Sequence, residues 1–168
     1  EVIVTSRSFL ASAAAVAAVG ATPVFADIDF ESGNLTTETI KPQITDQTRG
    51  VVVVHLGGWP ASMPAIMKLA EEHDLKIIED CAQAHGAAIS GQRVGSFGHA
   101  AAFSFCQDKI MSTGGEGGMI VTNDGQIRDI AWSLRDHGRN REQTMSDDHE
   151  SGFRWTQDRI GTNARMTE

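Results

Sequence analysis

Residues 50–80, GVVVVHLGGWPASMPAIMKLAEEHDLKIIED, decide the fold class. The runs VVVV at 51–54 and KII at 76–78 are apolar without alternation, which is typical of parallel strands covered by helices on both faces. Between them, residues 63–73 have the periodicity of an amphipathic helix. Its core-facing residues are predicted to be Ile66, Met67, Leu69 and Ala70. A strand, a helix and a strand in this order form a βαβ unit, so the sequence predicts a layered α/β fold.

The same alternation of strands and helices extends to both sides of this unit. Upstream it predicts strands at 2–5 and 22–29 and helices at 8–19 and 36–44, with Gly20 closing the first helix. Downstream it predicts turns at 90–92 and at Gly95, a strand ending near Phe105 and a strand at 119–124. Residues 142–150, EQTMSDDHE, are polar enough to predict a surface loop, and the last residues resemble the start of a helix.

Residues 6–27, SRSFLASAAAVAAVGATPVFAD, imitate an export signal. They contain a single Arg rather than a pair, and a strand-like run precedes it where a short charged leader is expected. A small-residue helix packed on a sheet is therefore the favoured interpretation. Export stays open as the alternative, and the Asn34 glycosylation sequon has meaning only in that case.

Composition excludes several classes of protein. The 168 residues include 14 Lys plus Arg and 22 Asp plus Glu, a net charge of −8, which argues against a nucleic-acid partner. A 40% hydrophobic and 21% charged composition is globular, and no apolar run reaches the roughly 20 residues of a membrane span. No membrane partner is therefore expected. Two cysteines cannot form a disulfide framework, so a cytoplasmic location is expected.

Polar residues follow three of the predicted strands. His55, Asp80 and the segment 104–109 come where ligands gather in open α/β sheets, outside the carboxyl ends of the strands. The glycine cluster at 114–118 fits neither the dinucleotide fingerprint nor the phosphate loop. The six histidines have no metal-ligand spacing, so no metal site is expected.

Several motifs in order along the chain resemble the DegT/DnrJ/EryC1/StrS family of pyridoxal-phosphate-dependent sugar aminotransferases. They are EDCAQAHGA at 79–87, GQRVGSFGHAAAFSF at 91–105, Lys109, GGEGGMIVTND at 114–124 and GTNARMTE at 161–168. The resemblance covers nearly the whole chain. It implies the major domain of a fold-type I transferase, a three-layer α/β/α structure with a mostly parallel sheet.

The resemblance implies pyridoxal 5'-phosphate as the cofactor and assigns two residues to its chemistry. This cofactor needs a lysine for its Schiff base and a carboxylate against its ring nitrogen. By position in the family motifs, Lys109 is the Schiff-base lysine and general base, and Asp80 is the carboxylate. A subgroup of sugar dehydratases carries histidine at the lysine position, so Lys109 argues against that alternative.

Four further residues are assigned to cofactor binding by the resemblance. Gln83 would lie near the ring oxygen, Ser104 would bind the phosphate, and Phe9 would stack on the ring. Asn163 would reach the cofactor of a neighbouring subunit, which implies a homodimer with shared sites. His85 follows in the same motif, but its residue type and place do not distinguish a site role from packing.

The implied reaction moves an amino group from an amino acid, glutamate in most relatives, to a nucleotide-linked keto-sugar. A non-catalytic or regulatory α/β module of the same fold is the alternative. Residues 1–168 are expected to be a partial major domain, incomplete at both ends, without the upstream phosphate-binding turn and the small carboxy-terminal domain. Trp59 in HLGGWP stands where many relatives have a polar residue, so the substrate neighbourhood is expected to differ.

Overall fold

A computed structural model describes residues 1–146 and 156–166. Its strands are β1 (Val2–Thr5), β2 (Pro23–Ala26), β3 (Gly50–Val54), β4 (Lys76–Asp80), β5 (Ala88–Ile89), β6 (Gln92–Arg93), β7 (Ala100–Ser104) and β8 (Gly118–Val121). Its α-helices are α1 (Leu10–Ala18), α2 (Thr37–Ile40), α3 (Met63–Glu72), α4 (Gly125–Arg135) and α5 (Arg141–Met145), and short 3-10 helices cover Lys41–Gln43 and Leu56–Gly58. The chain forms two compact units, Glu1–Thr122 and Asn123–Glu168.

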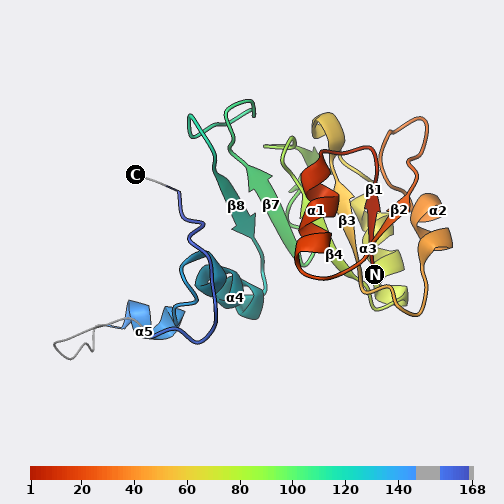
Figure 1. The fold of residues 1–168 in the computed structure, drawn as a ribbon. Coiled ribbons are helices and arrows are strands. Elements are labelled where there is room, and N and C mark those ends of the chain that lie inside the picture. The colour runs from red at the N-terminus through yellow and green to blue at the C-terminus, as the bar shows by residue number, and fades with distance from the viewer. Residues whose placement is uncertain (147–155, 167–168) are drawn as a thin grey trace. The chain divides into compact units, whose positions relative to one another are not determined.

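A six-stranded sheet is the centre of the first unit. Its strand order is β2-β1-β3-β4-β7-β8, visible in Figure 1, and neighbouring strands are parallel except for β7 and β8. Helices pack on both faces, α1 on one and α2 and α3 on the other. The predicted layered α/β fold with a mostly parallel sheet is confirmed.

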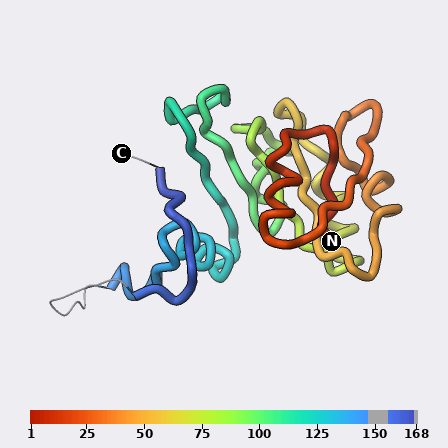
Figure 2. The backbone as a smooth tube through the Cα atoms, in the orientation of Figure 1, coloured from red at the N-terminus to blue at the C-terminus, as the bar shows by residue number. Residues whose placement is uncertain are grey.

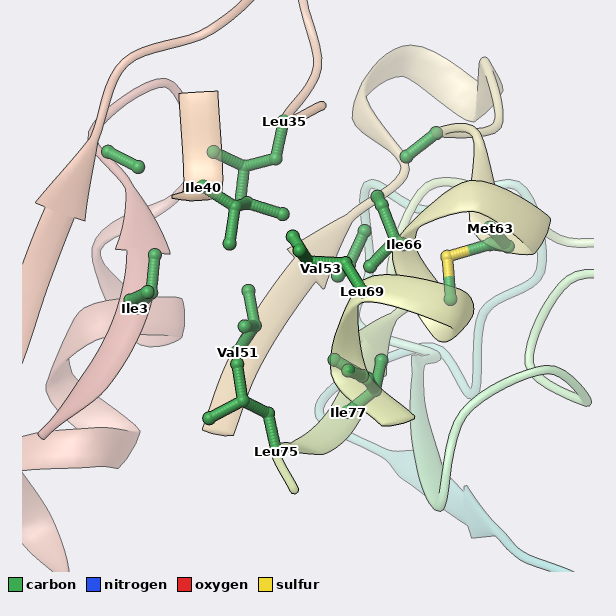
Figure 3. Packing of buried hydrophobic residues seen from close by; sticks show 13 residues of the cluster. Ile3, Leu35, Ile40, Val51, Val53, Met63, Ile66, Leu69, Leu75 and Ile77 are labelled. Atoms are coloured by element: carbon green, nitrogen blue, oxygen red, sulfur yellow. The ribbon is translucent and has the colours of Figure 1, made fainter. Parts of the chain in front are cut away.

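The larger part of the core lies between the sheet and helices α2 and α3. Figure 3 shows β1, β3 and β4 presenting side chains to this layer, and Met63, Ile66 and Leu69 of α3 pointing into it. The helix predicted at 63–73 is therefore confirmed, and its predicted apolar face is the packed one. Pro64 occupies its first turn, where a missing N–H costs no hydrogen bond.

Helix α1 covers the opposite face over β1 and β3. Ser12 and Val16 are its buried residues, and Val16 packs with Val4 and Val52. Gly20 follows at φ +78°, in the left-handed region that glycine tolerates, so the predicted small-residue helix and its terminator are confirmed.

The prediction that both faces of the KII strand are covered is wrong in the described structure. Along β4 burial alternates, and Ile78 is 45% exposed while Ile77 is fully buried. The reason is the place of β4 in the sheet, because α1 packs over β1 and β3. Ile78 therefore belongs to a face of β4 that this helix does not cover.

The carboxyl ends of β1, β3, β4 and β7 meet at one edge because these strands are parallel. Val54, Asp80 and Ala102 lie in register across this edge. Beyond β7, residues 105–117 form a long loop (the excursion after β7) before the chain returns as β8, which can be followed in Figure 2. Lys109 lies in this excursion.

The second unit contains helices α4 and α5. Asp124 caps α4, its Oδ1 accepting from the N–H groups of Gln126 and Ile127, and Asn140 caps α5 by accepting from Gln143. Residues 141–145 are thus helical, which makes the loop prediction wrong over 142–145; residues 147–150 lie outside the described structure. The predicted helix start at 167–168 also lies outside it.

Among the described residues, the helices are all too short or too polar to span a bilayer.

Candidate active site

A hollow at the carboxyl edge of the sheet brings together residues from four segments. The loop after β1 contributes Ser8 and Phe9, and the turn after β4 contributes Ala82 and Gln83 next to Asp80. The end of β3 and the loop after it add Val54, His55 and Leu56, and Lys109 comes from the excursion after β7. Residues up to 101 positions apart in the chain therefore line one hollow, as expected for a ligand site in an open α/β sheet.

Asp80 offers a carboxylate whose two oxygens are each held by a donor. The hydroxyl of Ser12 donates to Oδ2 at 2.7 Å, and the backbone N–H of Ala82 donates to Oδ1 at 3.1 Å. An ionised carboxylate has about four acceptor positions, so these two bonds leave capacity for a further donor from a ligand.

Lys109 is half-buried beside the same hollow. Its side chain is 18% exposed, and Nζ lies 3.9 Å from Oδ1 of the exposed Asp108. A hydrogen bond from the Cys106 thiol, at 2.8 Å, and the charge of Lys109 lower the pKa of Asp108. The amine is therefore accessible from the hollow while a neighbouring carboxylate balances its charge.

Gln83 and Phe9 complete the set of predicted residues in the hollow. Oε1 of Gln83 accepts from the N–H of Gly57 at 2.8 Å. This bond fixes the amide and leaves its NH₂ group as the end that can donate to a ligand. Phe9 is 79% exposed although it borders the hollow. An aromatic face left open to solvent at a pocket is suited to stack on a planar ligand.

Ser104 and Asn163 are not among the described residues that line the hollow. Ser104 is the last residue of β7, and its Oγ accepts from the N–H of Cys106 at 3.4 Å. Asn163 belongs to the second unit, where it is exposed and pairs with Asp136 through a β-bridge. The roles expected for these two residues stay predictions.

A buried hydrogen-bonded pair, His55 and Glu79, adjoins the hollow, which His55 itself lines. His55 Nδ1 accepts from the N–H of Ala61 at 3.1 Å, so Nε2 carries the proton and donates to Glu79 Oε2 at 3.0 Å. Both side chains are fully buried. Glu79 also accepts from three backbone N–H groups, those of Gly95, Phe97 and Gly98, at 2.7–2.8 Å.

The surroundings of Glu79 determine its charge. Burial raises the pKa of Glu79, but the hydrogen bonds from His55, Gly98 and Gly95 outweigh it and hold the pKa below the ordinary value of 4.5. The ionised carboxylate thus joins the end of β3, the end of β4 and the turn at 95–98. The sequence analysis assigned no role to Glu79. Its only signal in the sequence is that an acidic residue lies on the buried face of a strand.

The sulfur of Cys81 approaches this pair closely enough for the three side chains to be considered as metal ligands, with ligand atoms within 4.8 Å of one another. Both His55 nitrogens and both Glu79 oxygens are already hydrogen bonded, however. Burial, with the negative charges of Glu79 and Asp80, raises the pKa of the Cys81 thiol to about 12. A protonated thiol and satisfied partners describe a structural cluster rather than a metal site.

His85 lies against the aromatic side chains of β7 and the residue after it. Its ring centroid is 5.4 Å from that of Phe103, edge-on, and 5.8 Å from that of Phe105. Both ring nitrogens are buried without a hydrogen-bond partner among the described residues. The structure therefore places His85 in an aromatic packing cluster and not in the lining of the hollow.

Solved structures and curated proteins similar to this chain include aminotransferases and a protein from Geobacillus stearothermophilus named as a pleiotropic regulatory protein. The aminotransferase from Psychrobacter cryohalolentis is 55% identical with a TM-score of 0.95, over 98% of this chain and 42% of that one. NtdA from Bacillus subtilis, solved with bound cofactor PMP, is 27% identical with a TM-score of 0.78, over 92% of this chain and 34% of that one. The fold is thus that of the fold-type I pyridoxal-phosphate enzymes.

The family model of the DegT/DnrJ/EryC1/StrS aminotransferase family matches residues 1–168, and the chain belongs to that family. A UDP-N-acetyl-3-dehydro-alpha-D-glucosamine 3-aminotransferase from Acidithiobacillus ferrooxidans is 50% identical over 138 residues, 82% of this chain and 37% of that protein. The chain spans about two fifths of the length of the curated relatives it matches.

Proposed function

We propose that this chain is the cofactor-binding part of a pyridoxal-phosphate-dependent aminotransferase that transfers an amino group from an amino acid to a nucleotide-linked keto-sugar. The observation that carries the proposal is the shared hollow, in which Asp80, Lys109, Gln83 and Phe9 meet at one edge of the sheet. Membership of the aminotransferase family supports the reaction type.

The donors and acceptors of the hollow fit this cofactor. When bound, pyridoxal phosphate supplies an electron sink that stabilises negative charge on the carbon next to the transferred nitrogen. Asp80 would accept a hydrogen bond from the protonated ring nitrogen with the acceptor capacity that Ser12 and Ala82 leave free. Lys109 would hold the cofactor through Nζ and, when released, would carry a proton between the donor carbon and the cofactor carbon.

Two more side chains orient the ring in this proposal. Gln83 donates from its free NH₂ group to the ring oxygen, because its Oε1 is occupied by Gly57. Phe9 covers one face of the ring. Ser104 holds the phosphate, for which its position at the end of β7 is suitable.

The finer features of the reaction extend the proposal. The amino donor is glutamate, and the acceptor is a keto-sugar joined to a nucleotide, the substrate class named for the 50%-identical relative. Asn163 contacts the cofactor of a second subunit in a cytoplasmic homodimer. Trp59, 67% exposed on the loop after β3, borders the sugar-nucleotide site.

Residues 1–168 form part of the major domain only, and the complete protein contains the upstream phosphate-binding turn and the small carboxy-terminal domain. The relatives' greater length supports this. We therefore expect residues 1–168 alone to bind the cofactor weakly and to be inactive, and the full-length protein to be active.

Spectroscopy of the full-length protein tests the proposed function. With pyridoxal phosphate the wild type should be yellow, and glutamate should bleach the visible band as the amino group moves to the cofactor. Lys109→Ala should lack the band, whereas Lys68→Ala, which removes an exposed lysine of α3, should keep it. A wild type without a visible band would sink the proposal, and so would a Lys109→Ala protein that keeps the band and its response to glutamate.

A further inference from the structure

Helix α1 contributes a buried serine whose hydroxyl donates a hydrogen bond to the carboxylate of Asp80. Ser12 Oγ donates to Oδ2 at 2.7 Å, and the Ser12 residue is 6% exposed. The rest of α1 is apolar, LASAAAVAA, so this is its single polar side chain. A buried hydroxyl is costly unless it is hydrogen bonded, and here its partner is the carboxylate at the mouth of the site.

A second hydroxyl is hydrogen bonded to that of Ser12. Ser8 Oγ lies 2.7 Å from Ser12 Oγ, and Ser8 itself lines the hollow. Since an ionised carboxylate only accepts, the Ser12 proton points to Asp80, and Ser8 donates its proton to Ser12. The two hydroxyls thus form a directed chain that ends on Asp80, and bonds in such chains strengthen one another.

The same turn of the chain also carries the residue proposed to stack on the cofactor. The N–H of Ser12 donates to the carbonyl oxygen of Phe9 at 3.1 Å. The backbone that places the aromatic face at the hollow therefore also places the hydroxyl that reaches Asp80.

We infer that Ser12, supported by Ser8, is a positioning residue that fixes the rotation of the Asp80 carboxylate and so presents it to the ring nitrogen of the cofactor. The inference rests on the proposed function. The backbone N–H of Ala82 holds one oxygen, and Ser12 is the side chain that holds the other. Without Ser12 the carboxylate keeps one of its two donors and can turn away from the ring.

Binding of two cofactor forms to the full-length apoprotein separates this role from a general structural one. Pyridoxal phosphate has a ring nitrogen, and deaza-pyridoxal phosphate has a carbon in its place. If Ser12 acts through Asp80 on that nitrogen, Ser12→Ala should weaken binding of pyridoxal phosphate by about tenfold, the effect of one hydrogen bond to a charged group. Binding of the deaza form should change by less than about twofold, within the scatter of independent sites.

Further variants keep the test decisive. Ser12→Thr retains the hydroxyl and should restore binding of pyridoxal phosphate. Ser8→Ala leaves the Ser12–Asp80 bond in place. It should weaken the binding of pyridoxal phosphate by only about threefold. Ser133→Ala removes another buried serine, one whose hydroxyl has no partner among the described residues, and should change neither affinity.

Two outcomes overturn the inference. One is equal weakening of both cofactor forms by Ser12→Ala, and the other is unchanged binding of pyridoxal phosphate. Failure of the proposed function is distinguishable from both, because the wild-type protein would then bind neither form.

Discussion

Replacing Glu79 with alanine should loosen the turn at residues 95–98 without removing any residue of the hollow. The carboxylate accepts four hydrogen bonds, one from His55 and three from backbone N–H groups, all at 3.0 Å or less. Glu79→Ala leaves the buried His55 and the three partly buried amides without this acceptor. A donor that loses its acceptor costs about 1–3 kcal/mol, so the loss of these four bonds should cost about 3–5 kcal/mol once the turn relaxes.

Hydrogen exchange measures this cost where it arises. If the opening free energy of the turn falls by that amount, its amides should exchange about 10²- to 10⁴-fold faster, since each 1.4 kcal/mol is tenfold. The assay is exchange followed by mass spectrometry on peptides covering residues 94–99 of the full-length protein. Glu72→Ala, at the exposed end of α3, is the matched control and should leave these peptides unchanged.

The reasoning would be refuted by one result in particular. If the amides of Gly95, Phe97 and Gly98 exchange at the wild-type rate in Glu79→Ala, the carboxylate is not what holds the turn. A fast-exchanging turn would instead show that the Glu79 carboxylate holds residues 95–98 in place.

Three further predictions concern the same region. The pKa of Glu79 is held below 4.5, so its charge stabilises the fold above pH 4.5, and this stability is lost as the pH falls through the lower folded-state pKa. Below pH 4.5 the free energy of unfolding of Glu79→Gln should therefore fall less steeply with pH than that of the wild type. Iodoacetamide at pH 8 should label Cys106 and spare Cys81, whose thiol has a pKa of about 12, as peptide mapping would show. Gly95→Ala should destabilise the protein by about 1–3 kcal/mol in thermal unfolding, because the residue has φ +89° and a Cβ would lie 2.9 Å from the Phe103 ring.

Periodicity was sufficient to predict the layered fold because strands and helices bury side chains with different repeats. The VVVV run, buried at every residue of β3, and the α3 face with Ile66 and Leu69 show this directly. Exposure of Ile78 could not be predicted, since the KII run has the composition of a fully covered strand and its covering depends on where α1 packs.

The candidate site was predicted in part. Asp80 and Lys109 were found through motif order, and the parallel sheet explains why residues that follow different strands meet. The contact between Ser12 and Asp80 could not be predicted, because it joins residues 68 positions apart and serine in an alanine-rich helix gives no signal of its own. The helix at 141–145 was missed because its cap, Asn140, precedes a segment too polar to show helical periodicity.

The most direct test of the central claim is to locate the lysine that holds the cofactor. Full-length protein loaded with pyridoxal phosphate is treated with borohydride, which makes the lysine–cofactor bond permanent, and its peptides are analysed by mass spectrometry. The account predicts a single phosphopyridoxyl group on Lys109, and none after prior conversion of the cofactor with glutamate. A modification on another lysine, or no modification at all, would contradict the assignment of this hollow as the active site of an aminotransferase.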